Sequence, residues 1–123
     1  MGELLREYHQ PECGSGALIS CTSPSNPSYT VDELVHQLKI SEASLIIVHS
    51  QFLHTAQAAA RIVGIPQDHI ILLQDTPNNT NITLGQLIEL GSKQGSNLTP
   101  KRLQPGEARS KLALLSFSSG TTG

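Results

Sequence analysis

The chain has 123 residues, of which 37% are hydrophobic, 15% are charged and 3% are aromatic, and its formal net charge is −2. This weakly acidic balance argues against a general nucleic-acid binder. No apolar run approaches the ~20 residues of a membrane span, and the N-terminus lacks the apolar core of a secretory signal. We therefore expect a protein that is not secreted and has no membrane span, in the cytoplasm or associated with peroxisomes.

The first half of the chain is expected to hold one strand and one well-defined helix. Residues 1–12 are polar and unpatterned, whereas residues 17–21 have the composition of a short strand. Residues 23–27 contain two prolines and are expected to form a loop. Thr30 and Glu33 then form a T-x-x-E capping box, which predicts the start of a helix. The helix carries an apolar stripe of Val31, Leu34, Val35 and Leu38.

The second half alternates between buried strands and helices. Residues 45–48 and 69–73 are continuous apolar runs, typical of strands that are buried on both faces. An alanine-rich helix over 52–63 separates them and is expected to end at Gly64. Thr83 and Gln86 form a second capping box, which predicts the start of another helix. This helix carries an apolar stripe of Leu84, Leu87, Ile88 and Leu90.

A polar connection over 91–110 leads to a final strand, predicted at 111–117. Strands that alternate with helices of this length indicate crossover connections. The sequence therefore predicts an α/β fold of layered architecture, with a largely parallel sheet and crossover helices.

A loop of hydroxyl and glycine residues follows this last strand and is the main candidate for a binding site. It consists of Ser118, Ser119, Gly120, Thr121, Thr122 and Gly123. Small residues let the backbone come close to a ligand, and N–H and O–H groups donate to phosphate oxygens. By composition alone, such a cluster is more often a plain turn or tail. Its place at the end of a strand favours a ligand, because ligands of open α/β sheets gather beyond the carboxyl ends of strands.

Two stretches resemble one known family. Leu115–Gly123 is similar to the phosphate-loop signature of the adenylate-forming enzymes, the superfamily of AMP-dependent synthetases and ligases. Asn26–Thr30, together with Glu33-Leu34 and His36–Lys39, resembles a segment of the branch that holds the 4-coumarate–CoA ligases and acyl-CoA synthetases. The resemblance divides the chain into an unmatched segment, 1–12, and a partial AMP-binding domain, 13–123, that is truncated within the phosphate loop.

The resemblance implies an ATP-dependent carboxylic acid–CoA ligase. Its substrates would be a small carboxylic acid, ATP with Mg²⁺, and coenzyme A. Residues 118–122 match the family positions that bind ATP phosphates, and Gly120 and Gly123 would let the loop close and reopen. The family's loop continues with proline and lysine after Gly123, so we expect the chain to be inactive alone, with no catalytic residue or metal ligand assigned in it.

Two other functions remain open at this point. The chain could be a small non-catalytic α/β module that binds a nucleotide or a partner, or a scaffold that pairs with a full-length synthetase. Tyr29 is interpreted as a packing residue, with contact to a ligand as the lesser alternative, and His36 and His54 as surface or interhelical residues that do not act as bases. His49 and His69 flank strands without a carboxylate partner at a recognisable spacing.

Overall fold

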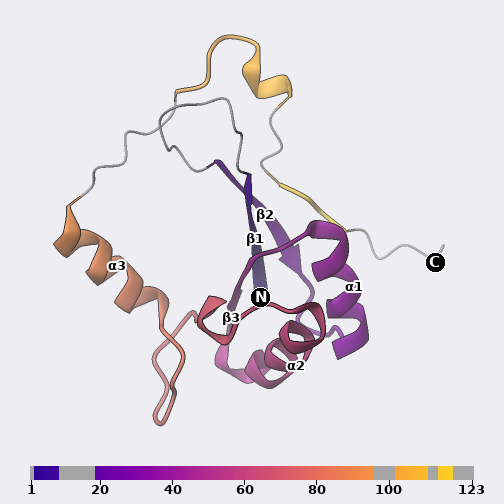
Figure 1. The fold of residues 1–123 in the computed structure, drawn as a ribbon, viewed down its shortest axis with the longest axis vertical. Coiled ribbons are helices and arrows are strands. Elements are labelled where there is room, and N and C mark those ends of the chain that lie inside the picture. Colours follow the sequence, from indigo (N-terminus) through magenta and orange to yellow (C-terminus); the bar gives the residue numbers. More distant parts are fainter. Residues whose placement is uncertain (1, 9–18, 96–101, 111–113, 118–123) are drawn as a thin grey trace.

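The computed structural model describes residues 2–8, 19–95, 102–110 and 114–117. A sheet and two helices that pack against it form the main body, and a further helix lies away from that body (Figure 1). The strands are β1 (Gly2–Tyr8), β2 (Ile19–Ser25), β3 (Leu45–Val48) and β4 (Ile70–Leu72). The helices are α1 (Val31–Ser41), α2 (Leu53–Val63) and α3 (Leu84–Gln94), with short 3-10 turns η1 (Ser50–Phe52), η2 (Gln67–His69) and η3 (Glu107–Arg109).

Strand β1 lies inside the sheet, in a segment that the sequence analysis left unpatterned. The strand order is β2-β1-β3-β4, and β1 pairs along its whole length with β2. Charged residues at positions 3, 6 and 7 interrupt the apolar pattern that would mark a central strand. The expectation of no element in 1–12 is therefore wrong, because backbone pairing with β2 and β3 decides the structure of this segment.

The strands other than β1 share one direction. β1 is antiparallel to β2 and to β3, and β3 is parallel to β4. β2, β3 and β4 therefore run the same way, as helical crossovers require. The α/β fold class is confirmed, with the parallel pairing between β3 and β4 and with β1 as an antiparallel insertion.

Strand β2 extends further than the sequence predicted. Residues 23–25 were expected in a loop, but the strand continues through Pro24 to Ser25. Proline lacks the N–H that a central strand must donate, and it is therefore confined to edge strands and strand ends. β2 stands at the edge of the described sheet, where this missing donor is tolerated.

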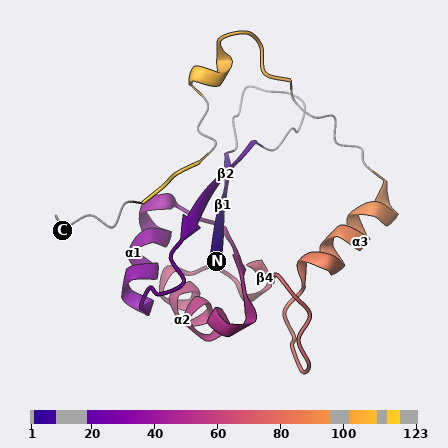
Figure 2. The ribbon, with the colours of Figure 1, turned by 180° about the vertical axis from the view of Figure 1, so that it is seen from behind.

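The capping box and the apolar stripe of α1 are confirmed. Glu33 N–H donates to Thr30 Oγ1 at 3.4 Å, and Thr30 N–H donates to a Glu33 carboxylate oxygen at 2.8 Å. Leu34, Val35 and Leu38 are buried and form the helix's contribution to the core. α1 and α2 lie side by side on the sheet, as both views show (Figures 1 and 2).

The core lies between this helix pair and one face of β3 and β4. Ile46 and Val48 of β3, and Ile70 and Leu72 of β4, alternate along their strands and contact the alanine-rich face of α2. The intervening Ile47 and Ile71 are buried as well, so the prediction of strands buried on both faces is confirmed.

Helix α3 has the predicted capping box, and most of its apolar stripe is exposed. Thr83 Oγ1 accepts from Gln86 N–H at 3.3 Å, and Gln86 Oε1 accepts from Thr83 N–H at 3.0 Å. Leu87, Ile88 and Leu90 are exposed, and α3 lies apart from α1 and α2 in both views (Figures 1 and 2). The apolar stripe predicted the helix correctly, but the sequence of a helix does not determine which other element packs against its apolar face.

The last predicted strand falls partly outside the described residues. Residues 111–113 are not among them, Leu114 makes a single β-bridge, and 115–117 have no regular structure. Among the described residues, no helix is long and apolar enough to cross a membrane.

Candidate functional site

The proposed phosphate loop lies outside the described residues, but the segment that leads into it does not. Ser118–Gly123 are the residues that the sequence singled out, and the described chain ends just before them, at Phe117. Residues 114–117 run beside β2 and towards α1 in both views (Figures 1 and 2). The contacts of this segment are therefore the part of the site that the structure describes.

A hydrogen bond joins this segment to the edge strand. Ser23 Oγ donates to the carbonyl oxygen of Leu115 at 2.8 Å, across 92 positions of sequence. Ser23 is buried near the carboxyl end of β2. This end of a parallel strand is where ligands of open α/β sheets bind.

A side chain of helix α1, Gln37, donates hydrogen bonds to the same part of β2. Gln37 Nε2 donates to Ser23 Oγ at 3.1 Å and to the Pro24 carbonyl oxygen at 2.9 Å. Gln37 is only 2% exposed, and its Oε1 has no hydrogen-bond partner in the described part of the chain. The sequence analysis gave neither Ser23 nor Gln37 a role, although Gln37 lies in the stretch His36–Lys39 that carries the family resemblance. A further signal was the pair Gln37 and Ser41, a polar row beside the apolar stripe of α1.

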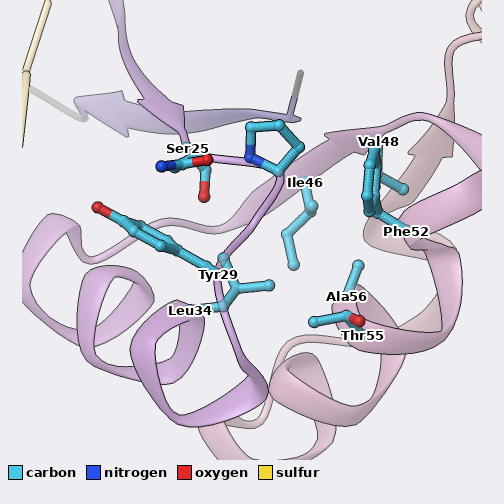
Figure 3. Close-up of a pocket in the computed structure, with 10 residues that line it drawn as sticks. Ser25, Tyr29, Leu34, Ile46, Val48, Phe52, Thr55 and Ala56 are labelled. Carbon is cyan, nitrogen blue, oxygen red and sulfur yellow. The ribbon is translucent and has the colours of Figure 1, made fainter.

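A small cavity opens beyond the carboxyl ends of β2 and β3 (Figure 3). Its volume is about 30 Å³, and its lining includes Leu34 of α1, Ala56 of α2, Val48 of β3, Phe52 of η1 and Tyr29 from the loop before α1. Pockets for small-molecule ligands usually measure about 300–1,000 Å³. The cavity can hold a water molecule but no nucleotide in this conformation.

Tyr29 packs against the hydrophobic core from the start of α1, as the sequence predicted. Tyr29 and Phe52 line the cavity on opposite sides (Figure 3). Tyr29 N–H donates to the carbonyl oxygen of Asn26 at 3.1 Å, within the loop between β2 and α1.

Of the histidines in the described ranges, His49 and His69 make local polar contacts. His36 and His54 are exposed, as expected for surface residues. His49 Nδ1 accepts from Gln51 N–H at 3.3 Å at the start of η1, and His69 Nδ1 lies 2.8 Å from the carbonyl oxygen of Ser44. In the described ranges, no three metal-ligating side chains come together.

Comparison with known proteins gives one consistent result. Residues 19–123 match the family of AMP-binding enzymes. The acyl-CoA ligase AKT1 of Alternaria alternata is 33% identical over 105 residues, which is 82% of this chain and 18% of the relative. The acyl-CoA ligase azaF of Aspergillus niger is 30% identical over 104 residues, and the phenylacetyl-CoA ligase epaB of Aspergillus niger is 30% identical over 100 residues; each match covers 80% of this chain and 19% of the relative.

No solved structure gives a significant match. The chain spans less than a fifth of the length of the curated relatives that it matches. The family match begins at the start of β2 and includes the segment 114–117 and the hydroxyl-rich loop that follows. On this match, and in agreement with the two sequence motifs, the chain belongs to the AMP-binding, adenylate-forming enzyme family.

Proposed function

We propose that the chain forms part of the ATP-binding domain of a carboxylic acid–CoA ligase. The observation that carries this proposal is the family match over residues 19–123, which includes the hydroxyl-rich loop. The relatives are named acyl-CoA ligases and a phenylacetyl-CoA ligase, which supports the acid–thiol class of reaction. The contact between β2 and the segment before the loop supports a site at this edge of the sheet.

The reaction would proceed in two displacements. A carboxylate oxygen of the acid attacks the α-phosphorus of ATP, the bond to the β-phosphate oxygen breaks, and acyl-adenylate and pyrophosphate form. The thiol of coenzyme A then attacks the acyl carbon, loses its proton and displaces AMP. In the first step the β- and γ-phosphates must be held in line with the attacking carboxylate, with their charge screened.

We assign this holding function to Ser118, Ser119, Gly120, Thr121 and Thr122, with Gly123 as the flexible residue that follows. Each hydrogen bond to a charged phosphate oxygen contributes about 1.5–3 kcal/mol, so several together keep the pyrophosphate group in register. Mg²⁺ would travel with ATP and neutralise part of the phosphate charge.

The 123-residue chain alone should bind Mg·ATP without forming acyl-adenylate. The loop supplies hydrogen-bond donors for phosphate, whereas no residue in the chain is assigned to activate or orient the carboxylate. The relative named phenylacetyl-CoA ligase and the resemblance to the 4-coumarate–CoA ligase branch make aromatic acids the first substrates to test, with medium-chain acids second.

The test has two parts that use the chain as it stands. Titration calorimetry with Mg·ATP should give saturable binding, and the absence of any binding would overturn the assignment of the loop. The chain is then incubated with ATP, labelled pyrophosphate and phenylacetic, cinnamic or medium-chain acids. We expect no acid-dependent exchange of label into ATP, and robust exchange would disprove inactivity of the chain alone.

A further inference from the structure

The hydrogen bonds among Gln37, Ser23 and Leu115 have one possible direction. Ser23 has a single hydroxyl proton, which goes to the Leu115 carbonyl oxygen at 2.8 Å. Ser23 Oγ must therefore accept at its other contact, where Gln37 Nε2 lies 3.1 Å away. The second proton of Nε2 goes to the Pro24 carbonyl oxygen at 2.9 Å, which can only accept. We call this directed series, from Gln37 through Ser23 to Leu115, the Gln37–Ser23 relay.

Burial makes the relay strong and costly to disturb. Ser23 is 3% exposed and Gln37 is 2% exposed, so water does not compete for these donors. Gln37 Oε1 is itself buried without a partner among the described residues, which costs about 1–3 kcal/mol. A methionine of similar volume would avoid that cost, so packing alone does not require glutamine here. The amide nitrogen, with its two donated bonds, is the part of the side chain that the structure uses.

The segment held by the relay is only partly buried. Leu114 is 57% exposed, Ser116 is exposed, and Leu115 and Phe117 are half-buried. Hydrophobic burial therefore fixes this segment weakly, and the bond to the Leu115 carbonyl adds a restraint to that of the β-bridge at Leu114.

We propose that Ser23 and Gln37 are positioning residues that fix the segment 114–117, and with it the point where the hydroxyl-rich loop begins. Neither residue needs to touch a phosphate. They act through Leu115, which precedes Ser118 by a few residues, and so reduce the freedom that ATP binding must otherwise remove. The consequence for ATP rests on the proposed function, whereas the restraint on the segment does not.

The chain contains a convenient internal probe for this restraint. It has two phenylalanines, Phe52 in the main body and Phe117 at the end of the segment. Biosynthetic labelling with 4-fluorophenylalanine therefore gives two ¹⁹F resonances, which single Phe→Leu variants assign. Phe52 packs against the hydrophobic core and serves as the reference signal.

We expect Ser23→Ala and Gln37→Met to move the Phe117 resonance towards its value in denatured chain and to narrow it, with the Phe52 resonance unchanged. Ser23→Thr retains the hydroxyl and should restore the Phe117 resonance. Ser41→Ala is the matched control, because Ser41 is a buried α1 hydroxyl that donates to the Gln37 carbonyl oxygen at 2.7 Å. An unchanged Phe117 resonance in both relay variants would overturn the proposal, as would an equal response to Ser41→Ala.

The second measurement is the affinity for Mg·ATP. Loss of one net hydrogen bond from the relay should weaken binding by about two- to tenfold in Ser23→Ala and leave Ser23→Thr within twofold of the parent. A Phe117 response without any change in affinity would contradict the positioning role. If the parent chain does not bind ATP, the proposed function fails, and the Phe117 resonance still decides whether the relay restrains the segment. If the Phe52 resonance also shifts in Ser23→Ala, the Ser23→Thr variant decides the outcome. Return of both resonances to their parent positions in Ser23→Thr supports the relay, and no return counts against it.

Discussion

Asn81 Nδ2 donates to the carbonyl oxygen of Ile70 at 3.1 Å and so completes the outer edge of β4 from a loop. The same nitrogen lies 3.3 Å from the Gln67 carbonyl oxygen, and Leu72 N–H donates to the carbonyl oxygen of Ile82 at 3.0 Å. Residues 81–83 thus satisfy backbone groups that an open edge strand would leave without partners.

Removal of the Asn81 amide should open this edge. Asn81→Ala leaves the Ile70 and Gln67 carbonyl oxygens without this donor, at a cost of about 1–3 kcal/mol in local stability. We expect the Leu72 amide to exchange with deuterium roughly tenfold faster or more. Asn78→Gly is the control, because Asn78 is exposed at a positive φ of 62°, which glycine adopts freely. Equal exchange rates in the two variants would contradict the role of Asn81.

Two residues of α1 should differ sharply in their response to truncation. Leu38 is 0% exposed and lies in the core, whereas Ile40 is 51% exposed on the same helix. Leu38→Ala should lower stability by about 2–5 kcal/mol through lost burial and a residual cavity. Ile40→Ala should cost well under half as much. Circular dichroism during urea titration measures both, and similar losses would show that α1 packs differently.

Replacement of two glycines by alanine should change stability in opposite directions. Gly64 ends α2 at a φ of +92°, a conformation that strains any residue with a Cβ. Gly91 lies inside α3, with nothing within 4 Å of the position of an added Cβ. Gly64→Ala should therefore destabilise the chain by about 1 kcal/mol, and Gly91→Ala should stabilise α3 by a similar amount. Helical ellipticity and thermal unfolding check both, and a shift of the same sign in the two variants would contradict this assignment.

The proposed phosphate loop is tested by removing a hydroxyl. Thr121→Ala should weaken Mg·ATP binding by about 10- to 150-fold, because a bond to a charged phosphate oxygen contributes about 1.5–3 kcal/mol. Ser116→Ala is the control from the segment before the loop, since Ser116 is exposed and is not assigned to phosphate. Titration calorimetry measures the affinities. A weaker affinity in Ser116→Ala than in Thr121→Ala would place the site elsewhere.

Local rules of sequence account for much of the fold. Thr30 with Glu33, and Thr83 with Gln86, predicted two helix starts because capping needs only side chains and backbone within one turn. Gly64 predicted the end of α2 for the same local reason. The apolar runs of β3 and β4 predicted strands that the structure buries.

The site was predicted only in part. The hydroxyl-rich loop and the stretch from Asn26 to Lys39 identified the family, which the match over 19–123 confirms. The contact that holds the segment before the loop could not be predicted, because Ser23 and Leu115 are 92 positions apart. Gln37 lies in the stretch that indicated the family, but the sequence gave it no role, which only its burial and its bond to Ser23 suggest.

The sequence by itself determined the helices, the buried parallel strands and the family, since each depends on neighbours in the chain or on a contiguous motif. Tertiary structure alone decided that β1 joins the sheet, that β2 continues through Pro24, and that α3 leaves its apolar face exposed. It also decided which groups contact the segment before the hydroxyl-rich loop. These features depend on backbone pairing and burial between residues far apart in sequence, and no local pattern records such contacts.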